Sequence, residues 1–223
     1  MRGRHGKITL SDVNPVGRQA VRFVSLVALY LAGAHVALWF VQGPDQVTLI
    51  WPPGGVVYAV LLLYGLRWWP FIVVSVLLTH WWWAPVPALF LPYSVLSNVA
   101  GGLLGAGFVL RYHALAVERY SLVGGFTLLA GGLIMVVVSA AIGTIGMLHA
   151  NMIAAGDELA AALRWAMGDL FGIIAVTPAV LLAGRGLLWG VRAEAAFGYA
   201  RWPEKSLWLC AVLGSLTAVA WAG

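Results

Sequence analysis

The sequence predicts an all-α fold, a polytopic bundle of transmembrane helices with seven spans. Three observations support this prediction. Of the 223 residues, 62% are hydrophobic and only 9% are charged, whereas a water-soluble domain carries about a quarter charged residues. The chain also divides into apolar segments that are long enough, or nearly so, to cross a hydrocarbon core of about 30 Å. Finally, Lys and Arg concentrate in alternate connecting segments, as the flanks of membrane spans do.

Taken in order, the chain begins with a polar and basic stretch, residues 1–20, which we expect to be cytoplasmic. The apolar run after it is longer than a signal-peptide core and lacks a clear small-residue cleavage site, so it should remain as a signal anchor. Residues 21–223 should then form a single transmembrane bundle. The expected spans cover about residues 21–41, 50–66, 69–84, 86–110, 121–147, 159–183 and 206–222.

The division between the third and fourth spans is the least distinct. Three tryptophans and two prolines between residues 81 and 87 indicate a tight turn at the membrane surface. Seven spans place all but one of the 13 Lys and Arg residues on the side of the amino terminus, and the exception, Arg164, lies at the outer end of the sixth span. Because cytoplasmic flanks are enriched in Lys and Arg, the expected location is the inner membrane with the amino terminus in the cytoplasm.

Asp169 is the most informative polar residue because it lies about ten residues into the sixth predicted span, roughly 15 Å deep at 1.5 Å per residue. An aspartate at the centre of a membrane helix costs about 2.5–3.5 kcal/mol, so it should face the bundle or a wet cavity. Helical spacing places Trp165 and Thr177 on its face, with Gly168 and Gly172 beside it. Two interpretations remain open: a structural hydrogen-bonded carboxyl group, or a ligand- or ion-responsive one.

Asn98 lies in the middle of the fourth predicted span, on a face with Ser94, Gly101 and Gly105. We expect it to neighbour Asp169, although an interhelical hydrogen bond without any ligand would also explain it. The spacing of Gly101 and Gly105 is the GxxxG pattern, which predicts close contact with another helix.

Trp51, Pro52 and Pro53 open the second predicted span. Prolines fit the first turn of a helix because the backbone N–H groups there have no intrahelical partner. The carbonyls before the prolines and the Trp51 ring are candidates for lining an outer ligand pocket, while a simple helix start explains the same residues.

Other chemistry is not indicated. His35, His80 and His149 map to the outer half, but their spacing matches no metal-ligand motif, and Cys210 is the only cysteine. We therefore expect no metal, no cofactor and no catalytic residues. The net charge of +5 is dispersed among apolar segments rather than gathered in a patch, so nucleic acid is not an expected partner.

Two stretches of the sequence resemble the first type of membrane-associated sensor domain, the MASE family of bacterial signalling proteins. The resemblance covers about residues 21–221. The residues that carry it are Trp51, Pro52, Pro53 and Gly54, followed by Gly65, Trp69 and Pro70, and, in the sixth span, Trp165, Gly168, Asp169, Gly172 and Pro178.

The resemblance implies an amino-terminal sensory module of about eight helices fused to a cytoplasmic histidine kinase, diguanylate cyclase or phosphodiesterase, which act in two-component and cyclic-di-GMP signalling. Seven spans and no output domain lead us to expect either a module truncated before an eighth span or one that acts through a separate partner. The expected partners are membrane lipids, this output domain or protein, an unidentified small ligand, and a second copy in a homodimer.

The leading hypothesis is a sensory module that detects an outer-leaflet or periplasmic stimulus through Asp169 and Asn98. A small permease or substrate-binding transporter component is the alternative, since a buried carboxylate and interrupted helices also serve transport. A purely structural membrane subunit is the third interpretation.

Overall fold

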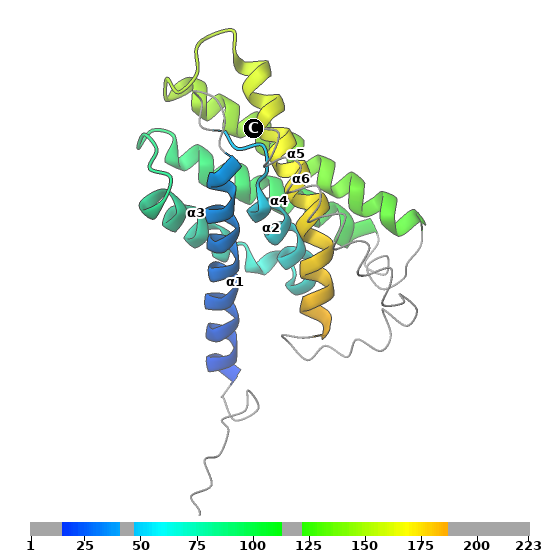
Figure 1. Cartoon of the computed structure of the whole chain (residues 1–223). Coiled ribbons are helices and arrows are strands. Elements are labelled where there is room, and N and C mark those ends of the chain that lie inside the picture. The colour runs from blue at the N-terminus through cyan, green and yellow to red at the C-terminus, as the bar shows by residue number, and fades with distance from the viewer. Residues whose placement is uncertain (1–14, 41–46, 113–121, 187–223) are drawn as a thin grey trace, which may run out of the picture.

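The computed structural model describes residues 15–40, 47–112 and 122–186 (Figure 1). Regular structure in these ranges is helical, as predicted. The elements are α1 (Pro15–Ala37), η1 (Leu38–Phe40), α2 (Pro52–Tyr64), η2 (Leu66–Trp68), α3 (Pro70–Trp82), α4 (Leu91–Tyr112), α5 (Leu122–His149) and α6 (Glu158–Gly186), where η marks a short 3₁₀-helix.

Four of the described helices, α1, α4, α5 and α6, are long and apolar enough to cross a membrane. The other two, α2 and α3, have 13 residues each, or about 20 Å of helix, which is less than a hydrocarbon core of about 30 Å. Both begin at prolines, and α2 stops at Gly65, whose φ of +84° is incompatible with continuing the helix. The seven predicted spans are therefore not confirmed. Six coincide with helices of which two are short, and 206–222 lies outside the described residues.

Successive helices alternate in direction. At one end of the bundle the rings of His35 and Trp83 lie 5.5 Å apart, and at the other end those of Phe23 and Trp68 lie 6.4 Å apart. We call the first the upper end; it carries the connecting segments 47–51, 83–90 and 150–157, and the 150–157 loop lies at the top of Figure 1. The lower end carries the start of α1, the η2 turn and the end of α6. The alternation agrees with the predicted order of connecting segments, including the turn around residues 83–87.

Helix α1 begins at Pro15, six residues before the predicted start of the first span. Proline suits the first helical position, and the polar residues after it continue the helix beyond its apolar part. The cytoplasmic placement of residues 1–20 remains a prediction.

The core surrounds α2, in which ten of the 13 residues, Pro53 to Leu62, are buried. This helix packs against α1, α4 and α6, and the Tyr58 hydroxyl donates a hydrogen bond to the Leu128 carbonyl of α5 at 2.7 Å. A helix enclosed on all sides needs no polar face, which explains its uniformly apolar sequence.

Helices α4 and α5 pack closely through small residues. A Cβ atom on Gly105 would lie 2.5 Å from the Gly131 carbonyl oxygen, and one on Gly101 would lie 2.8 Å from the Met135 carbonyl oxygen. The predicted helix contact at Gly101 and Gly105 is therefore confirmed.

Candidate functional site

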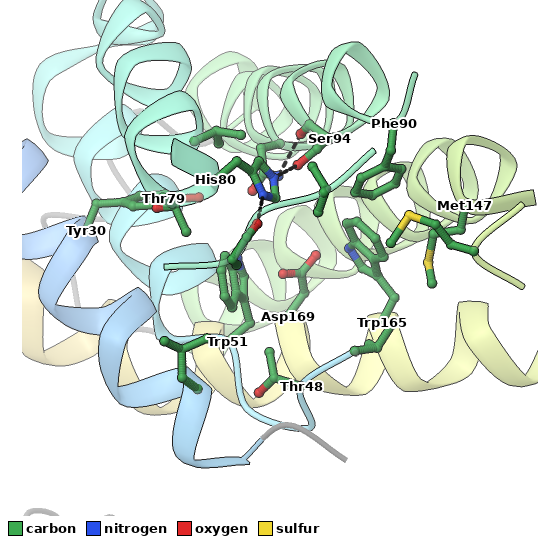
Figure 2. A pocket seen from close by; sticks show the side chains of 17 residues that line it. Tyr30, Thr48, Trp51, Thr79, His80, Phe90, Ser94, Met147, Trp165 and Asp169 are labelled. Carbon is green, nitrogen blue, oxygen red and sulfur yellow. Dashed lines mark hydrogen bonds between the residues drawn. The ribbon is translucent and has the colours of Figure 1, made fainter. Parts of the chain in front are cut away.

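A cavity of about 130 Å³ lies at the upper end of the bundle (Figure 2). Its walls come from five of the helices, α1 and α3 to α6. Residues of three connecting segments contribute to its lining as well, namely Thr48, Ala84, Val86 and Met152. Because segments that are distant in sequence meet here, a molecule in the cavity would contact most of the bundle at once.

The segment before α2 lies directly on α6. The Trp51 backbone N–H donates to the Gly168 carbonyl at 2.9 Å. A Cβ atom on Gly168 would lie 2.5 Å from the Thr48 carbonyl oxygen, and one on Gly172 would overlap the Trp51 carbonyl. Only glycine at both positions allows this approach, so the two glycines of α6 position the Trp51 segment over Asp169.

Asp169 is only 2% exposed and lines the cavity. The Ser139 hydroxyl and the Trp165 indole are its hydrogen-bonding neighbours, and the Trp165 Nε1–H also donates to Ser139 Oγ at 3.0 Å. A Cβ atom on Gly54 would lie 3.0 Å from Asp169 Oδ1, so this oxygen lies against the first turn of α2. The positive end of the α2 dipole and the two donors offset part of the cost of a buried negative charge.

The second carboxyl oxygen, Oδ2, is buried and has no hydrogen-bond partner among the described residues. An unsatisfied buried acceptor costs about 1–3 kcal/mol, and more when it is charged. Asp169 therefore lines the cavity with one carboxyl oxygen, Oδ1, packed against α2 and the other, Oδ2, without a described hydrogen-bond partner.

Aromatic rings form much of the wall. Trp51 packs edge-on against Tyr30 with ring centroids 6.4 Å apart, and Phe90 packs edge-on against Trp165 at 6.2 Å. Figure 2 draws Asp169 between the two indole rings. The Tyr30 hydroxyl is fully buried and has no hydrogen-bond partner among the described residues.

A second cluster of polar side chains, His80, Ser94 and Asn98, lines the cavity from α3 and α4. The His80 ring contacts the Ala84 carbonyl through Nδ1 at 2.8 Å and the Ser94 hydroxyl through Nε2 at 2.7 Å. A carbonyl only accepts, so Nδ1 carries the proton, and in the neutral ring Nε2 accepts from Ser94. The Asn98 amide donates to the Ser94 carbonyl at 2.9 Å, and these contacts tie the α3–α4 connection to the wall.

The structure brings four of the six predicted binding residues together, since Asp169, Trp165, Asn98 and Trp51 all line the cavity. Among the described residues, the Asn98 amide group donates to Ser94 and Ser97 of its own helix, and no bond to another helix is seen there. Ligand binding by these residues remains a prediction.

Pro52 and Pro53 are not among the lining residues. They pack on α1, where a Cβ atom on Gly33 would lie 3.2 Å from Pro52 Cβ and 3.5 Å from Pro53 Cδ. Their position favours the helix-start interpretation, because a proline ring at the start of α2 fills space against α1 instead of facing the cavity. Thr177, predicted to share the face of Asp169, donates to the Gly55 carbonyl at 3.2 Å and joins α6 to α2 below the cavity.

Sequence reasoning missed Tyr30 and Thr79 on the cavity wall and Ser139 beside Asp169, and it considered His80 only as a metal ligand. Each is an isolated polar group on an otherwise apolar helix, and a search for hydroxyl and imidazole groups near the centre or outer end of every span would have found them. The described residues contain no group of three or more His, Cys, Asp or Glu side chains that could hold a metal ion. The absence of a metal or cofactor remains a prediction.

The MASE1 family model matches residues 22–222 of the chain. No match was found among curated proteins or among solved structures.

Proposed function

The chain belongs to the MASE1 family of membrane sensory domains, and from that premise we propose that the cavity at the upper end is its sensing site. With four described helices of membrane length, the protein is a multi-pass membrane protein. In the proposed function, a stimulus at the cavity alters the surroundings of Asp169, and the bundle passes the change to the lower end.

The observation that carries this proposal is the unpaired Oδ2 of Asp169. A carboxyl group needed only for packing would have both oxygens satisfied, because buried polar groups in native structures nearly always find partners. Strained or unsatisfied groups persist where function requires them. The clustering of Tyr30, His80 and the two indoles around the same space supports a site built for an occupant.

Helix α6 offers a physical route to the lower end. It runs without interruption from Glu158 to Gly186 and carries both Asp169 and Thr177, whose hydroxyl is bonded to α2. Pro178 follows directly and lacks the N–H that would pair with the Ile174 carbonyl, so the helix can bend there at low cost. A shift of α6 at Asp169 would therefore change both its contact with α2 and the direction of its lower part.

The proposal also includes the orientation of the bundle in the membrane. The distribution of Lys and Arg supports an upper end outside the inner membrane and an amino terminus in the cytoplasm. The lower end would then face a cytoplasmic kinase, diguanylate cyclase, phosphodiesterase or separate partner protein, acting on one copy or a homodimer. The bundle itself contributes recognition and movement, and the chemistry belongs to that output.

Distance measurements between spin labels test the relay without knowledge of the output. In a Cys210→Ser background, cysteines at Arg67 in η2 and at Ala183 near the lower end of α6, both at least partly exposed, would carry the labels. We expect Asp169→Asn, which removes the charge but keeps the size, to shift this distance distribution. The matched control Asp157→Asn, an exposed carboxylate in the 150–157 loop, should leave it as in the unsubstituted protein. An unchanged distribution in a folded Asp169→Asn protein would refute the relay.

A further inference from the structure

We propose that the cavity takes a small organic cation, a primary ammonium group on a short apolar body. This inference rests on the proposed function, because it names the ligand class of the same site. It follows from the charge, the wall and the size of the cavity.

The negative charge of an ionised Asp169 is uncompensated within the described lining of the cavity. Asp169 is held by donors: the Ser139 hydroxyl, the Trp165 indole and the first turn of α2. Burial disfavours the ionised carboxylate, and each of these donors favours it over the neutral acid. The described residues that line the cavity include no Lys and no Arg, and Oδ2 has no described partner. A cation in the cavity would pair with this oxygen.

The remaining features of the wall suit an ammonium group better than a bare metal ion. The Tyr30 oxygen is a second buried atom without a described partner and can accept an N–H. Trp51 and Trp165 present indole rings on either side of Asp169 in Figure 2, and an organic cation gains from contact with such rings. A metal ion would require several oxygen ligands at once, and the described wall is mainly apolar.

The volume of the cavity limits the size of the apolar part of the ligand. The cavity measures about 130 Å³, slightly below the roughly 150 Å³ of an engineered apolar cavity that admits benzene. A branched alkylamine of four carbons fits this space. Peptides, nucleotides and sugars exceed it.

Calorimetric titration of the full chain in nanodiscs of zwitterionic lipid tests the charge preference with three probes of similar shape: isobutylamine, isobutanol and isobutyrate. Only the first is a cation at neutral pH. We expect isobutylamine to bind at least about tenfold more tightly than the other two, since a charged hydrogen bond is worth that factor or more. Equal binding of isobutanol, or binding of isobutyrate alone, would overturn the inference.

Substitutions test whether isobutylamine binds at Asp169. Asp169→Asn should weaken isobutylamine at least about tenfold, while Asp157→Asn should bind it as the unsubstituted chain does. If thermal unfolding shows that Asp169→Asn is not folded, Tyr30→Phe replaces it, with an expected loss of about tenfold. Undiminished isobutylamine binding by the folded variant, whether Asp169→Asn or Tyr30→Phe, would overturn the inference.

The failure of this inference and the failure of the proposed function give different results. If no amine binds but Asp169→Asn still shifts the Arg67–Ala183 distance, the cavity senses another ligand class. If that distance is insensitive to Asp169, the proposed function fails, whatever the cavity binds.

Discussion

The contact between α4 and α5 predicts a difference between two alanine substitutions in the same helix. A Cβ atom on Gly105 would lie 2.5 Å from the Gly131 carbonyl oxygen and 2.7 Å from Met135 Cβ, whereas one on Gly107 would meet only the Leu66 Cδ1 atom at 3.6 Å. The first position requires the backbones to separate. The second offers an ordinary van der Waals contact.

The magnitudes follow from these distances. Overpacking at Gly105→Ala costs about 1–3 kcal/mol, and replacing a helical glycine by alanine returns about 0.5–1 kcal/mol. The net loss is at most about 2.5 kcal/mol, and in a chain of this size each kcal/mol shifts Tm by about 2–4 °C. Gly105→Ala should therefore unfold up to roughly 10 °C lower, while Gly107→Ala, with the helical gain alone, should unfold about 1–4 °C higher.

Thermal unfolding of the purified proteins in one detergent, followed by circular dichroism, measures this difference. The two variants lie two residues apart in α4 and add the same methyl group, so the comparison isolates packing from helix propensity. If Gly105→Ala unfolds at or above the Tm of Gly107→Ala, the close approach of α4 and α5 is incorrect.

Three further predictions concern topology, packing and the buried carboxyl group. In a Cys210→Ser background, an impermeant thiol reagent should label a cysteine at Asp157 in intact cells but not one at Glu118, and the reverse pattern would invert the orientation. Thr177→Val removes the hydrogen bond from α6 to α2 and should lower the free energy of unfolding by about 1 kcal/mol, measured by denaturant titration; an unchanged midpoint would mean that water replaces the bond. Asp169→Asn should be at least as stable as the unsubstituted protein because it removes an unsatisfied buried charge. Asp169→Leu should lose about 1–3 kcal/mol by depriving the buried Ser139 hydroxyl of its acceptor. A marked loss in the Asn variant would make the carboxylate a structural residue.

The helical fold could be predicted from sequence because the bilayer imposes one rule, that long apolar runs form helices with their polar backbone satisfied internally. The rule does not fix helix length. Segments 50–66 and 69–84 contain no Asp, Glu, Lys or Arg, yet their helices stop at 13 residues each. Their ends are set by Gly65 and by the starting prolines, which local sequence reveals only when the turn geometry is known.

The candidate site was partly predictable for a related reason. Asp169 and Trp165 stand out because they lie four residues apart on one helix, and helical spacing alone places them together. Tyr30, His80 and Ser139 reach the same region from three other helices, and no spacing within one segment reports how helices pack against each other. The tryptophan–proline segment lies over Asp169 because of Gly168 and Gly172, a pairing that became clear only in three dimensions.

The central claim is that the charge of Asp169, at the upper end, sets the arrangement of the lower end. A pH titration of the distance between labels at Arg67 and Ala183 tests it most directly. Asp169→Asn is compared with His80→Gln, because His80 is another titratable group on the cavity wall. We predict that the distance changes with pH in the unsubstituted bundle and in His80→Gln, and that it does not respond to pH in Asp169→Asn. A pH response that persists unchanged in a folded Asp169→Asn protein would contradict the claim.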